Sequence, residues 1–347
     1  MPLTMTGVVL PGERHLELRS FPVPEPGAGE VLVRMRASTL CGSDLRAIYR
    51  PAVQGHGPEA YRGVIAGHEP CGVVERTGPG VRAFRAGERV ILYHIVGCGT
   101  CQACRTGWMI SCSSPDRAAY GWQRDGGHAD FVLADQRTLV HLPDELTAVD
   151  GAIVACGYGT AYAACLRAGV SGLDRVLVTG MGPVGMGAAL LSQAMGARVT
   201  GVELNPERAA LARQAGVQEV VSGDEVEVAA RAASEGRGFE VAIDCSGAAP
   251  ARRLCLELAR DWGRVVFVGE GGTVDFAPSP LLIHKQLALH GSWVCSISQM
   301  EDLVELLVRW RMHPEVIVTH RFPLDQAEEA YRLFDTGESG KVAITWE

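Results

Sequence analysis

The stretch that decides the fold is RVLVTGMGPVG, residues 175–185. Residues 175–179 have the apolar, β-branched character of a buried strand, and a helical pattern begins at Pro183. Gly180, Gly182 and Gly185 form a G-x-G-x-x-G at the junction. The first glycine allows a tight turn, the second lets a pyrophosphate approach the backbone, and the third lets helix and strand pack closely. The segment therefore predicts a βαβ unit that binds a dinucleotide.

The sequence on the C-terminal side of this stretch continues the same alternation. Apolar strand patterns at 198–204, 241–247 and 264–269 are separated by helical patterns, including 206–216 and 250–260. Such alternation predicts a doubly wound parallel sheet of the Rossmann type in an α/β protein. A glycine-rich turn in some other α/β fold is the alternative interpretation of the motif.

The choice of cofactor depends on the end of the next predicted strand. Glu203 lies there, 23 residues after Gly180, where a carboxylate can accept hydrogen bonds from ribose hydroxyls and would repel a 2′-phosphate. Leu204 and Asn205 supply no cation that could bind a 2′-phosphate, but Arg208, one helical turn later, is a cation. The pattern favours NAD over NADP. The expected cofactor-binding residues are Gly180, Gly182, Pro183, Val184, Gly185, Glu203, Arg208 and Val268.

The rest of the chain has a different texture. Up to about residue 150 it consists of short alternating strands broken by Gly and Pro. After about residue 295, two helical patterns lead to a final strand at 341–346, and we expect this tail to return to the first domain. The predicted domains are 1–152, which is β-rich, 153–294, which binds the cofactor, and the C-terminal segment 295–347.

Composition limits the classes of partner. The chain has 347 residues, a net charge of −8 and a pI near 5.7, and no Lys/Arg cluster, which argues against nucleic acid. No uninterrupted apolar run is long enough to cross a bilayer, so we expect no membrane partner. The N-terminus lacks a basic segment followed by an apolar one, so we expect a cytoplasmic protein with a small polar ligand.

Four cysteines are closely spaced within a segment of about residues 94–115. Cys98, Cys101, Cys104 and Cys112 follow C-x2-C-x2-C-x7-C, and four thiolates can close a tetrahedron around a structural zinc. An iron–sulfur cluster and a disulfide pair are the alternatives; a reducing compartment disfavours the disulfide. The cysteines expected to be simple core residues are Cys71, Cys165, Cys245, Cys255 and Cys295.

Several motifs together carry a family resemblance. Cys41-Gly-Ser43-Asp44, then Gly67-His68-Glu69, the four-cysteine lobe and GMGPVG occur in this order along nearly the whole chain. In this combination the chain resembles zinc-dependent medium-chain alcohol dehydrogenases, particularly those acting on polyols and threonine. The resemblance implies a GroES-like catalytic domain beside the Rossmann domain, a second, catalytic zinc, and a homodimer or homotetramer built partly through residues 287–296.

The resemblance assigns roles at the catalytic zinc residue by residue. Cys41 and His68 match two zinc ligands, and Cys156 falls at the position of the third. Polyol and threonine dehydrogenases often have Glu at that third position, and a small buried thiol is the alternative interpretation of Cys156. Glu69 matches a conditional ligand, and Asp44 matches the carboxylate that orients the histidine ring.

Three protein ligands would leave one tetrahedral position for water or an alcohol oxygen, as catalytic zinc requires. Ser43 would take the alcohol proton. Family members often continue this relay through a histidine five residues after the first ligand, where this chain has Arg46. Arginine stays protonated, so we expect Arg46 to contact the substrate or a cofactor phosphate instead.

Substrate contacts are less well specified. His94 occupies a place that borders the substrate pocket in threonine dehydrogenases, although it could be an ordinary loop histidine. The insertion 49–63 offers Tyr49, Arg50, His56, Glu59 and Tyr61 either to a hydroxyl-rich ligand or to solvent. Trp122 could likewise line the pocket or pack against the cysteine lobe.

These observations predict an NAD- and zinc-dependent dehydrogenase of a polyol, sugar or cyclitol secondary alcohol. A second interpretation keeps the chemistry but changes the substrate to an amino alcohol such as threonine, or to a simple alcohol. A third is a non-catalytic NAD-binding protein whose zinc–thiolate sites sense oxidation. The open ligand set and Ser43 argue against that third interpretation, because a scaffold needs no open coordination position.

Overall fold

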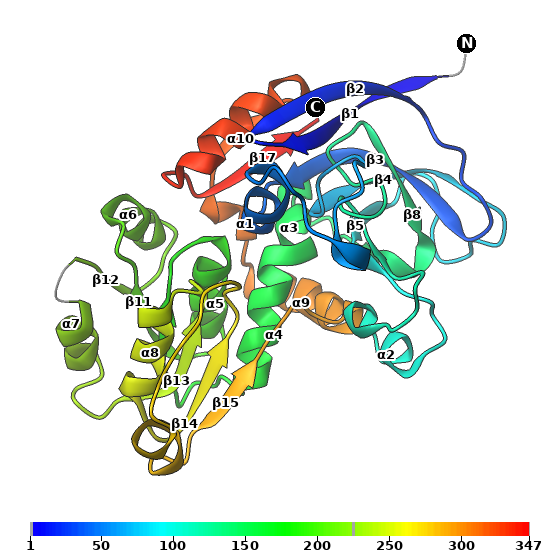
Figure 1. Cartoon of the computed structure of the whole chain (residues 1–347). Helices are drawn as coiled ribbons and strands as arrows, with labels where there is room; N and C mark the ends of the chain where they lie inside the picture. Colours follow the sequence, from blue (N-terminus) through cyan, green and yellow to red (C-terminus); the bar gives the residue numbers. More distant parts are fainter. Residues whose placement is uncertain (1–2, 224–225, 347) are drawn as a thin grey trace. The chain divides into compact units, whose positions relative to one another are not determined.

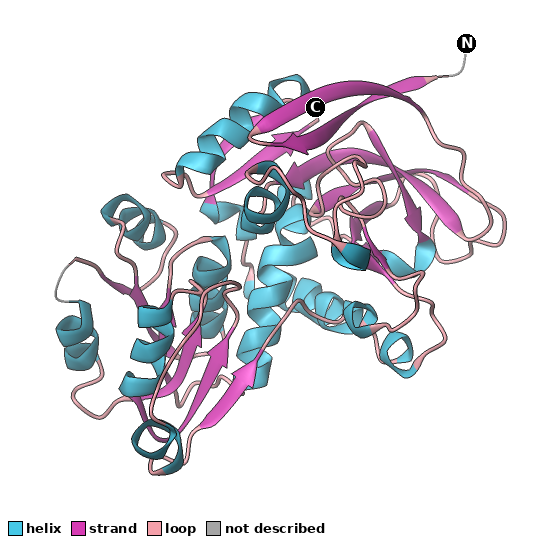
Figure 2. Ribbon diagram, viewed as in Figure 1, coloured by secondary structure: helices cyan, strands magenta, loops and turns pink. Residues whose placement is uncertain are grey.

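The computed structural model describes residues 3–223 and 226–346 (Figure 1). The chain divides into two compact units. Unit 1 contains residues 1–156 and 295–347, and unit 2 contains residues 157–294. The chain therefore passes from unit 1 into unit 2 once and then returns to unit 1. Helices and strands are mixed in both units (Figure 2).

Unit 1 is organised by a seven-stranded sheet that is almost entirely antiparallel. Its order is β16-β17-β3-β4-β5-β9, with β8 also paired to β3, and only β16 and β17 run parallel. The strands are β3 (Glu30–Thr39), β4 (Pro70–Thr77), β5 (Arg89–Leu92), β8 (Phe131–Asp135), β9 (Leu139–His141), β16 (Val318–Phe322) and β17 (Lys341–Thr345). The last strand of the chain thus lies beside one of the first.

Smaller elements complete unit 1. The other strands are the hairpin β1 (Thr4–Gly12) and β2 (His15–Pro22), and the short pair β6 (Ile95–Val96) and β7 (Ala118–Ala119). The helices are α1 (Gly42–Asp44), α2 (Gln102–Arg105), α3 (Ala148–Ile153), α9 (Ile297–Trp310) and α10 (Ala327–Thr336). The capping box of Ser296 and Gln299 fixes the start of α9.

Unit 2 is a six-stranded parallel sheet in the order β12-β11-β10-β13-β14-β15. Its strands are β10 (Arg175–Thr179), β11 (Arg198–Val202), β12 (Glu219–Val221), β13 (Phe239–Asp244), β14 (Ala259–Phe267) and β15 (Ala288–Gly291). Its helices are α4 (Gly159–Ala168), α5 (Pro183–Ala194), α6 (Pro206–Gln214), α7 (Val226–Ala233) and α8 (Ala249–Leu258). This is the doubly wound Rossmann arrangement, and the protein combines it with a β-rich GroES-like unit.

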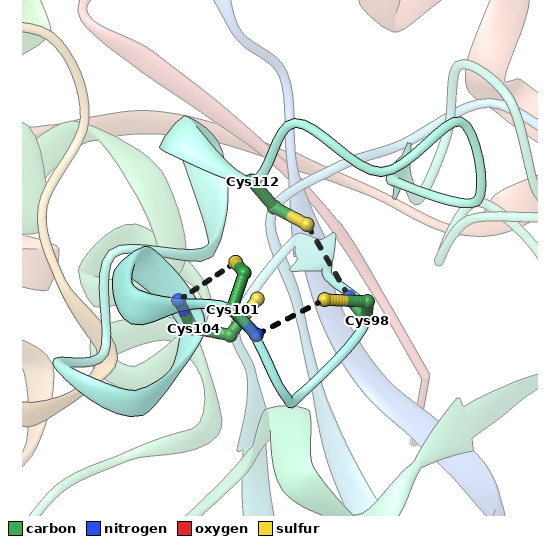
Figure 3. Close-up of side chains that lie close together, drawn as sticks. All are labelled: Cys98, Cys101, Cys104 and Cys112. Atoms are coloured by element: carbon green, nitrogen blue, oxygen red, sulfur yellow. Dashed lines mark hydrogen bonds between the residues drawn. The ribbon is translucent and has the colours of Figure 1, made fainter.

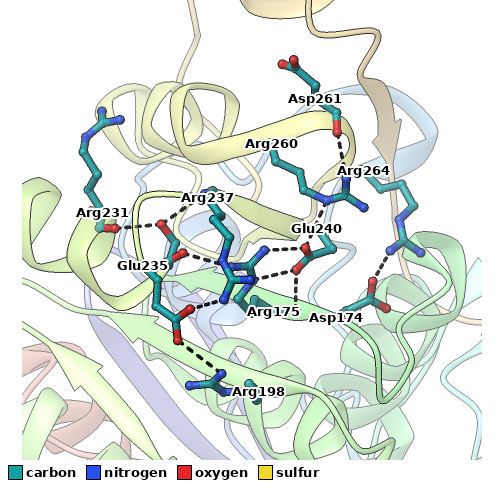
Figure 4. Close-up of polar contacts among 12 residues, drawn as sticks. Asp174, Arg175, Arg198, Arg231, Glu235, Arg237, Glu240, Arg260, Asp261 and Arg264 are labelled. Carbon is teal, nitrogen blue, oxygen red and sulfur yellow. Dashed lines mark hydrogen bonds and ion pairs between the residues drawn. The ribbon is translucent and has the colours of Figure 1, made fainter.

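Ion pairs link the beginnings of the central strands of unit 2 (Figure 4). Arg175 Nη2 at the start of β10 lies 2.7 Å from Glu240 Oε1 on β13, and Arg260 Nε lies 3.1 Å from the same oxygen. A pocket of about 400 Å³ lies beside this network, lined partly by Arg231, Arg237 and Lys285. Lys285 Nζ donates to three backbone carbonyls near the end of α8, so its positive charge stabilises the C-terminus of this helix.

One helical stretch, residues 148–168, is long and apolar enough to span a membrane by length and composition. Within it, 83% of the most apolar window is buried inside the protein, as in the core helix of a soluble protein. This single stretch is therefore weak evidence for a membrane span.

Candidate metal centres and cofactor loop

The four cysteines of the lobe come together around one point (Figure 3). The sulfurs of Cys98, Cys101, Cys104 and Cys112 all lie within 4.8 Å of one another. Cys101 is the N-cap of α2, and Cys104 lies on that helix. The lobe is short enough that its turns alone bring the four thiols together.

The surroundings of these sulfurs suit thiolates that bind a metal. The backbone N–H groups of Cys98, Cys101 and Cys104 donate to sulfurs of the cluster at 3.4–3.5 Å. Hydrogen bonds from Thr100 and the N–H of Cys101 lower the pKa of Cys98 to about 5, whereas burial raises the pKa of Cys104 to about 12, so Cys104 would lose its proton only when a metal binds. Among the described residues no disulfide forms, and all eleven cysteines are free. The donor set therefore fits a closed tetrahedral site for zinc.

A second cluster gathers Cys41, His68, Glu69 and Cys156, whose ligand atoms also lie within 4.8 Å of one another. Cys41 caps α1, His68 and Glu69 directly precede β4, and Cys156 lies in the helical turn η5 (Val154–Tyr158) that follows α3. Three distant segments thus supply the cluster. The structure brings together all four of the residues that the sequence proposed for the catalytic zinc.

Asp44 contacts two members of this cluster. Its Oδ1 lies 2.8 Å from Nδ1 of His68, so the Nε2 atom of the ring is left to face the metal position. Its Oδ2 accepts a hydrogen bond from the backbone N–H of Cys41 at 3.3 Å. Asp44 is fully buried. One carboxylate therefore orients both the histidine ring and the backbone of the cysteine.

The cluster has the electrostatic character of a metal site. Hydrogen bonding from Cys156 lowers the pKa of Cys41 well below its usual value, although burial acts in the opposite direction. The pKa of His68 is raised well above its usual value, because the charges of Asp44 and Cys41 outweigh the effect of burial. Without a metal these shifts favour a thiolate at Cys41 beside a protonated His68, and the pKa of Cys156 is raised by its hydrogen bond with Cys41 and by burial. The thiolate is the form of Cys that binds zinc, and His68 and Cys156 would each lose a proton when the metal binds.

Glu69 supplies the observation that tests the fit of a metal. Its Oε1 is buried and has no hydrogen-bond partner among the residues that the structure describes. Its Oε2 contacts Thr39 Oγ1 and Lys341 Nζ. Burial raises the pKa of Glu69 to about 7, against the influence of Lys341. A buried oxygen without a partner next to two thiols and an imidazole fits a cation at this point.

Thr39 and Lys341 are site residues that sequence reasoning missed. Lys341 is 1% exposed, and its partner Glu69 is fully buried. Fully buried lysines are rare unless paired. A lysine at the start of the apolar stretch KVAIT was the available signal, but nothing local indicated its partner.

Ser43 lies beside the ligand atoms. Its Oγ lies 3.3 Å from Cys41 Sγ and 3.5 Å from His68 Nε2. Its hydroxyl is therefore placed to exchange a proton with a substrate oxygen that enters this cluster. Arg46 is exposed on the following helical turn, Leu45–Tyr49.

His94 is buried next to the same cluster. Its ring centroid lies 5.3 Å from that of His68, and its Nδ1 lies 2.8 Å from the carbonyl oxygen of Ala155. A carbonyl can only accept, so the proton is on Nδ1 and Nε2 keeps a lone pair. Burial and the neighbouring His68 lower the pKa of His94 to about 4. His94 is thus a neutral hydrogen-bond acceptor at Nε2.

The insertion 49–63 was expected to offer its side chains either to a ligand or to solvent, and two of them do neither. Tyr49 and Tyr61 are buried in the hydrophobic core of unit 1, and the Tyr61 hydroxyl contacts Val64 O. Trp122 packs against the same core. Arg50 pairs with Asp335, while His56 is exposed. Glu59 pairs with Arg117. The two tyrosine side chains therefore stabilise the loop from inside.

A third group with metal-binding side chains lies at the start of α3. It consists of Asp150, His313 and Glu315. Both oxygens of Asp150 already accept hydrogen bonds, from the backbone of Thr147 and Glu315 and from His313. This group is explained by helix capping.

The glycine loop of unit 2 has the geometry that the motif requires. Gly180 has φ +83°, and a Cβ there would lie 2.8 Å from Ser246 Cβ. A Cβ on Gly185 would lie 1.7 Å from Gly180 O, whereas one on Gly182 would meet no atom within 4 Å. Pro183 and Val184 begin α5. Gly182 therefore lies at an open helix N-terminus suited to a phosphate.

Glu203 lies at the end of β11 and is buried. Its Oε2 accepts from Met181 N at 2.8 Å, and its Oε1 accepts from Asn205 N at 3.0 Å. Arg208 Nη1 lies 3.7 Å from Oε2. Val268 is buried directly after β14. A carboxylate has about four acceptor positions, so Glu203 can also accept from a ribose.

Comparison with known proteins identifies two family models in the chain. Residues 27–144 match the alcohol dehydrogenase GroES-like domain, and residues 183–309 match the zinc-binding dehydrogenase domain. The first match contains Cys41, His68, Glu69 and the cysteine lobe, and the second starts at Pro183 of the glycine loop.

Similar proteins cover nearly the whole chain. An uncharacterized zinc-type alcohol dehydrogenase-like protein of Escherichia coli (strain K12), YphC, is 46% identical over 99% of both chains. The sorbitol dehydrogenase of Halalkalibacterium halodurans is 30% identical and the L-threonine 3-dehydrogenase of Rhizobium rhizogenes is 31% identical, each over 96% of both chains.

Solved structures have the same fold. Acetophenone reductase from Geotrichum candidum in complex with NAD superimposes with a TM-score of 0.85 at 25% identity, covering 100% of this chain and 98% of that one. A zinc-binding dehydrogenase from Sinorhizobium meliloti bound to NADP gives 0.86 at 25% identity, covering 99% and 100%.

Proposed function

Because the chain belongs to the zinc-dependent medium-chain alcohol dehydrogenases, we propose that it transfers a hydride between NAD(H) and a secondary alcohol or its ketone. The substrate in this proposal is a polyol, sugar or cyclitol. The chain would hold two zinc ions, one in the cysteine lobe and one at Cys41, His68 and Cys156. Zinc-dependent oxidoreductase chemistry is the common property of the family.

The incomplete ligand set around Cys41 carries the proposal. Cys41, His68 and Cys156 would supply three ligands and leave a tetrahedral position open as long as Glu69, the fourth member of the cluster, does not bind the metal, unlike the four thiols of the lobe. A zinc ion held there supplies a Lewis acid that polarises the alcohol or carbonyl oxygen. Asp44 contacts Nδ1 of His68 and so leaves Nε2 of the ring for the metal. A purely structural site would have no reason to keep a position open.

Ser43 would relay the proton that the substrate oxygen loses or gains: as its Oγ accepts that proton, it passes its own hydroxyl proton on to solvent. Its Oγ lies close to two ligand atoms and is half-buried, so it can contact both the substrate oxygen and solvent. Arg46 stands where relatives have a relay histidine and cannot exchange a proton. We assign Arg46 to contact with an anionic or strongly polar group of the substrate or cofactor.

The preference for NAD rests on Glu203. Its buried carboxylate lies beside the glycine loop, where it would accept from ribose hydroxyls and repel a 2′-phosphate. Arg208 lies close enough to weaken that repulsion. NAD-bound and NADP-bound proteins both occur among the structural neighbours, so Glu203 is the feature that favours NAD.

His94 supports a substrate rich in hydroxyl groups. Its Nε2 can accept a hydrogen bond from a second hydroxyl of the substrate, next to the reacting one. The same acceptor could take a proton from an ammonium group, and L-threonine 3-dehydrogenases are among the relatives. An amino alcohol is therefore the second candidate substrate.

We further propose a homodimer or homotetramer in the cytoplasm, with neither nucleic acid nor a membrane as partner. The edge strand β15 leaves one row of backbone groups unpaired in unit 2, and Leu289 and Trp293 are 36% and 55% exposed. An exposed edge with apolar side chains is a common surface for self-association.

The test combines metal analysis with a substrate screen. The purified protein should contain two zinc ions per chain and should reduce NAD with at least one member of a panel of polyols, inositols, sugars and amino alcohols. Cys41→Ser should abolish turnover while NAD binding persists. One zinc per chain with no turnover across the panel would favour the oxidation-sensing alternative and contradict the enzyme assignment.

A further inference from the structure

Lys341, Thr39 and Glu69 lie side by side at the ends of three neighbouring strands. Thr39 is the last residue of β3, Lys341 is the first of β17, and Glu69 directly precedes β4. β17 and β4 pair with opposite edges of β3, with Ala343 opposite Thr39 and Pro70 opposite Ser38. The sheet register therefore places an ammonium and a hydroxyl group against the carboxylate of Glu69.

The two oxygens of Glu69 are in different environments. Oε2 contacts both Lys341 Nζ and Thr39 Oγ1. Oε1 is buried with no partner among the described residues, and Glu69 belongs to the same cluster as Cys41, His68 and Cys156. One oxygen is thus held by Lys341 and Thr39, and the other has no partner among the described residues and belongs to the carboxylate in the cluster.

The charges in the cluster explain why Glu69 stays in contact with Lys341 and Thr39. Two thiolates, from Cys41 and Cys156, balance the double charge of a zinc ion, and Lys341 balances Glu69. Without Lys341, Glu69 would be a buried anion whose nearest cation is the metal itself. It would then compete with substrate for the open coordination position.

We propose that Lys341 is a positioning residue that, with Thr39, holds Glu69 off the metal and so keeps the fourth coordination position open for substrate. The inference rests on the proposed function, because it requires a metal at Cys41, His68 and Cys156. It assigns the fully buried Lys341 a role beyond stabilising the strand that carries it.

The experiment compares Lys341→Met with wild type, Lys341→Arg and the double variant K341M/E69Q. Zinc removal by a chromophoric chelator is followed over time, and the zinc of the cysteine lobe serves as the internal control. The protein is also loaded with Co²⁺, and its visible absorption spectrum is recorded with and without an alcohol. Circular dichroism checks folding.

Lys341→Met should retain the metal of this site longer than wild type, because Glu69 could then bind the metal as a further ligand. Its cobalt spectrum should shift and should no longer respond to alcohol, while K341M/E69Q and Lys341→Arg should return toward wild type. If Lys341 only stabilised the local structure, Lys341→Met should lose its metal faster than wild type. If Lys341→Met does not fold, Thr39→Val, which leaves the ion pair in place, should shift both readouts in the same direction.

Faster metal loss in Lys341→Met, or a cobalt spectrum identical to wild type in Thr39→Val and Lys341→Met, would overturn the role of Lys341 and leave the proposed function standing. A wild-type protein with metal only in the cysteine lobe would overturn both.

Discussion

Asp44 Oδ1 lies 2.8 Å from His68 Nδ1, and the other oxygen of the same carboxylate accepts from the backbone of Cys41. One buried side chain therefore orients two of the residues that would bind the catalytic metal. Asp44 also stands at the third position of the short helix that Cys41 caps, so the local turn fixes this geometry. In the proposed function, the sequence Cys-Gly-Ser-Asp thus supplies a ligand, a hydroxyl that relays a proton and the group that orients the next ligand.

Asp44→Asn should lower the metal affinity or the activity by about 10–100-fold, because an amide no longer holds the imidazole with a full charge. Metal content after dialysis and kcat/KM are the measurements. Asp116→Asn, at an exposed aspartate of the same unit, is the matched control and should be silent. An Asp44→Asn enzyme with wild-type metal content and kcat/KM would show that the 2.8 Å contact has no functional role.

The two clusters of candidate metal ligands could largely be predicted from sequence, because Cys41, His68, Glu69 and the lobe cysteines occur in short motifs with characteristic neighbours. Lys341 could not be predicted in the same way, since 272 residues separate it from Glu69 and only the pairing of β17 with β3 brings them together. Sequence spacing reports on contacts within a turn or a loop. It carries little information about which distant strand becomes a neighbour.

The loop tyrosines illustrate a second limit. Tyr49 and Tyr61 have hydroxyl groups and lie in a polar insertion, so they could be taken for ligand contacts. Both rings are buried, because an aromatic side chain contributes a large apolar area that favours the core. Tyr61 satisfies its hydroxyl on the backbone at Val64. The strand and helix pattern around the glycine loop was more informative, because periodicity and turn chemistry agree there.

His94→Phe should raise KM for a polyol about 2–12-fold, the effect of losing one hydrogen bond of roughly 0.5–1.5 kcal/mol. The reason is the lone pair that the contact with Ala155 O leaves on Nε2. A simple secondary alcohol without a further hydroxyl is the control substrate, and its KM should stay unchanged. Equal effects on both substrates would assign His94 to packing against His68.

Glu203→Ala should weaken NAD binding about 10–100-fold, from the loss of a charged hydrogen-bond acceptor of roughly 1.5–3 kcal/mol, and should improve the relative use of NADP. Arg208 would then no longer face the carboxylate of Glu203 and could attract a 2′-phosphate. The measurement is kcat/KM with each cofactor. Glu207→Ala, an exposed residue in the first turn of α6, is the control. An unchanged ratio of NAD to NADP use would remove Glu203 from the basis of cofactor choice.

Cys104→Ser should remove about one zinc per chain and lower the thermal unfolding midpoint, because a closed four-thiolate site contributes directly to stability. Cys71→Ser is the matched control, since Cys71 is buried in the same unit but lies outside both clusters. It should lose stability from burying a hydroxyl but keep both zinc ions. Loss of the catalytic metal instead of the lobe metal in Cys104→Ser would contradict the assignment of the two sites.

His313 should make the stability of unit 1 depend on pH. Its Nδ1 lies 2.9 Å from Asp150 Oδ2, and the hydrogen bond and charge of Asp150, with Glu315 nearby, raise the pKa of His313 above its ordinary value. Arg321, which is also charged, is paired with Glu315.

Because the folded-state pKa of His313 is raised, the stabilisation is complete below about pH 6.5, the pKa in the unfolded chain, and is lost as pH rises through the folded-state pKa. The imidazole is about half exposed, so the effect should be only about 0.2–1 kcal/mol. The urea midpoint of His313→Gln should therefore fall below that of wild type at pH 6 and approach it at pH 9. The control is His320→Gln, at an exposed histidine of β16, whose difference in urea midpoint from wild type should be the same at both pH values. A His313→Gln deficit of equal size at pH 6 and pH 9 would mean that the neutral hydrogen bond to Asp150, and not the charge, stabilises the start of α3.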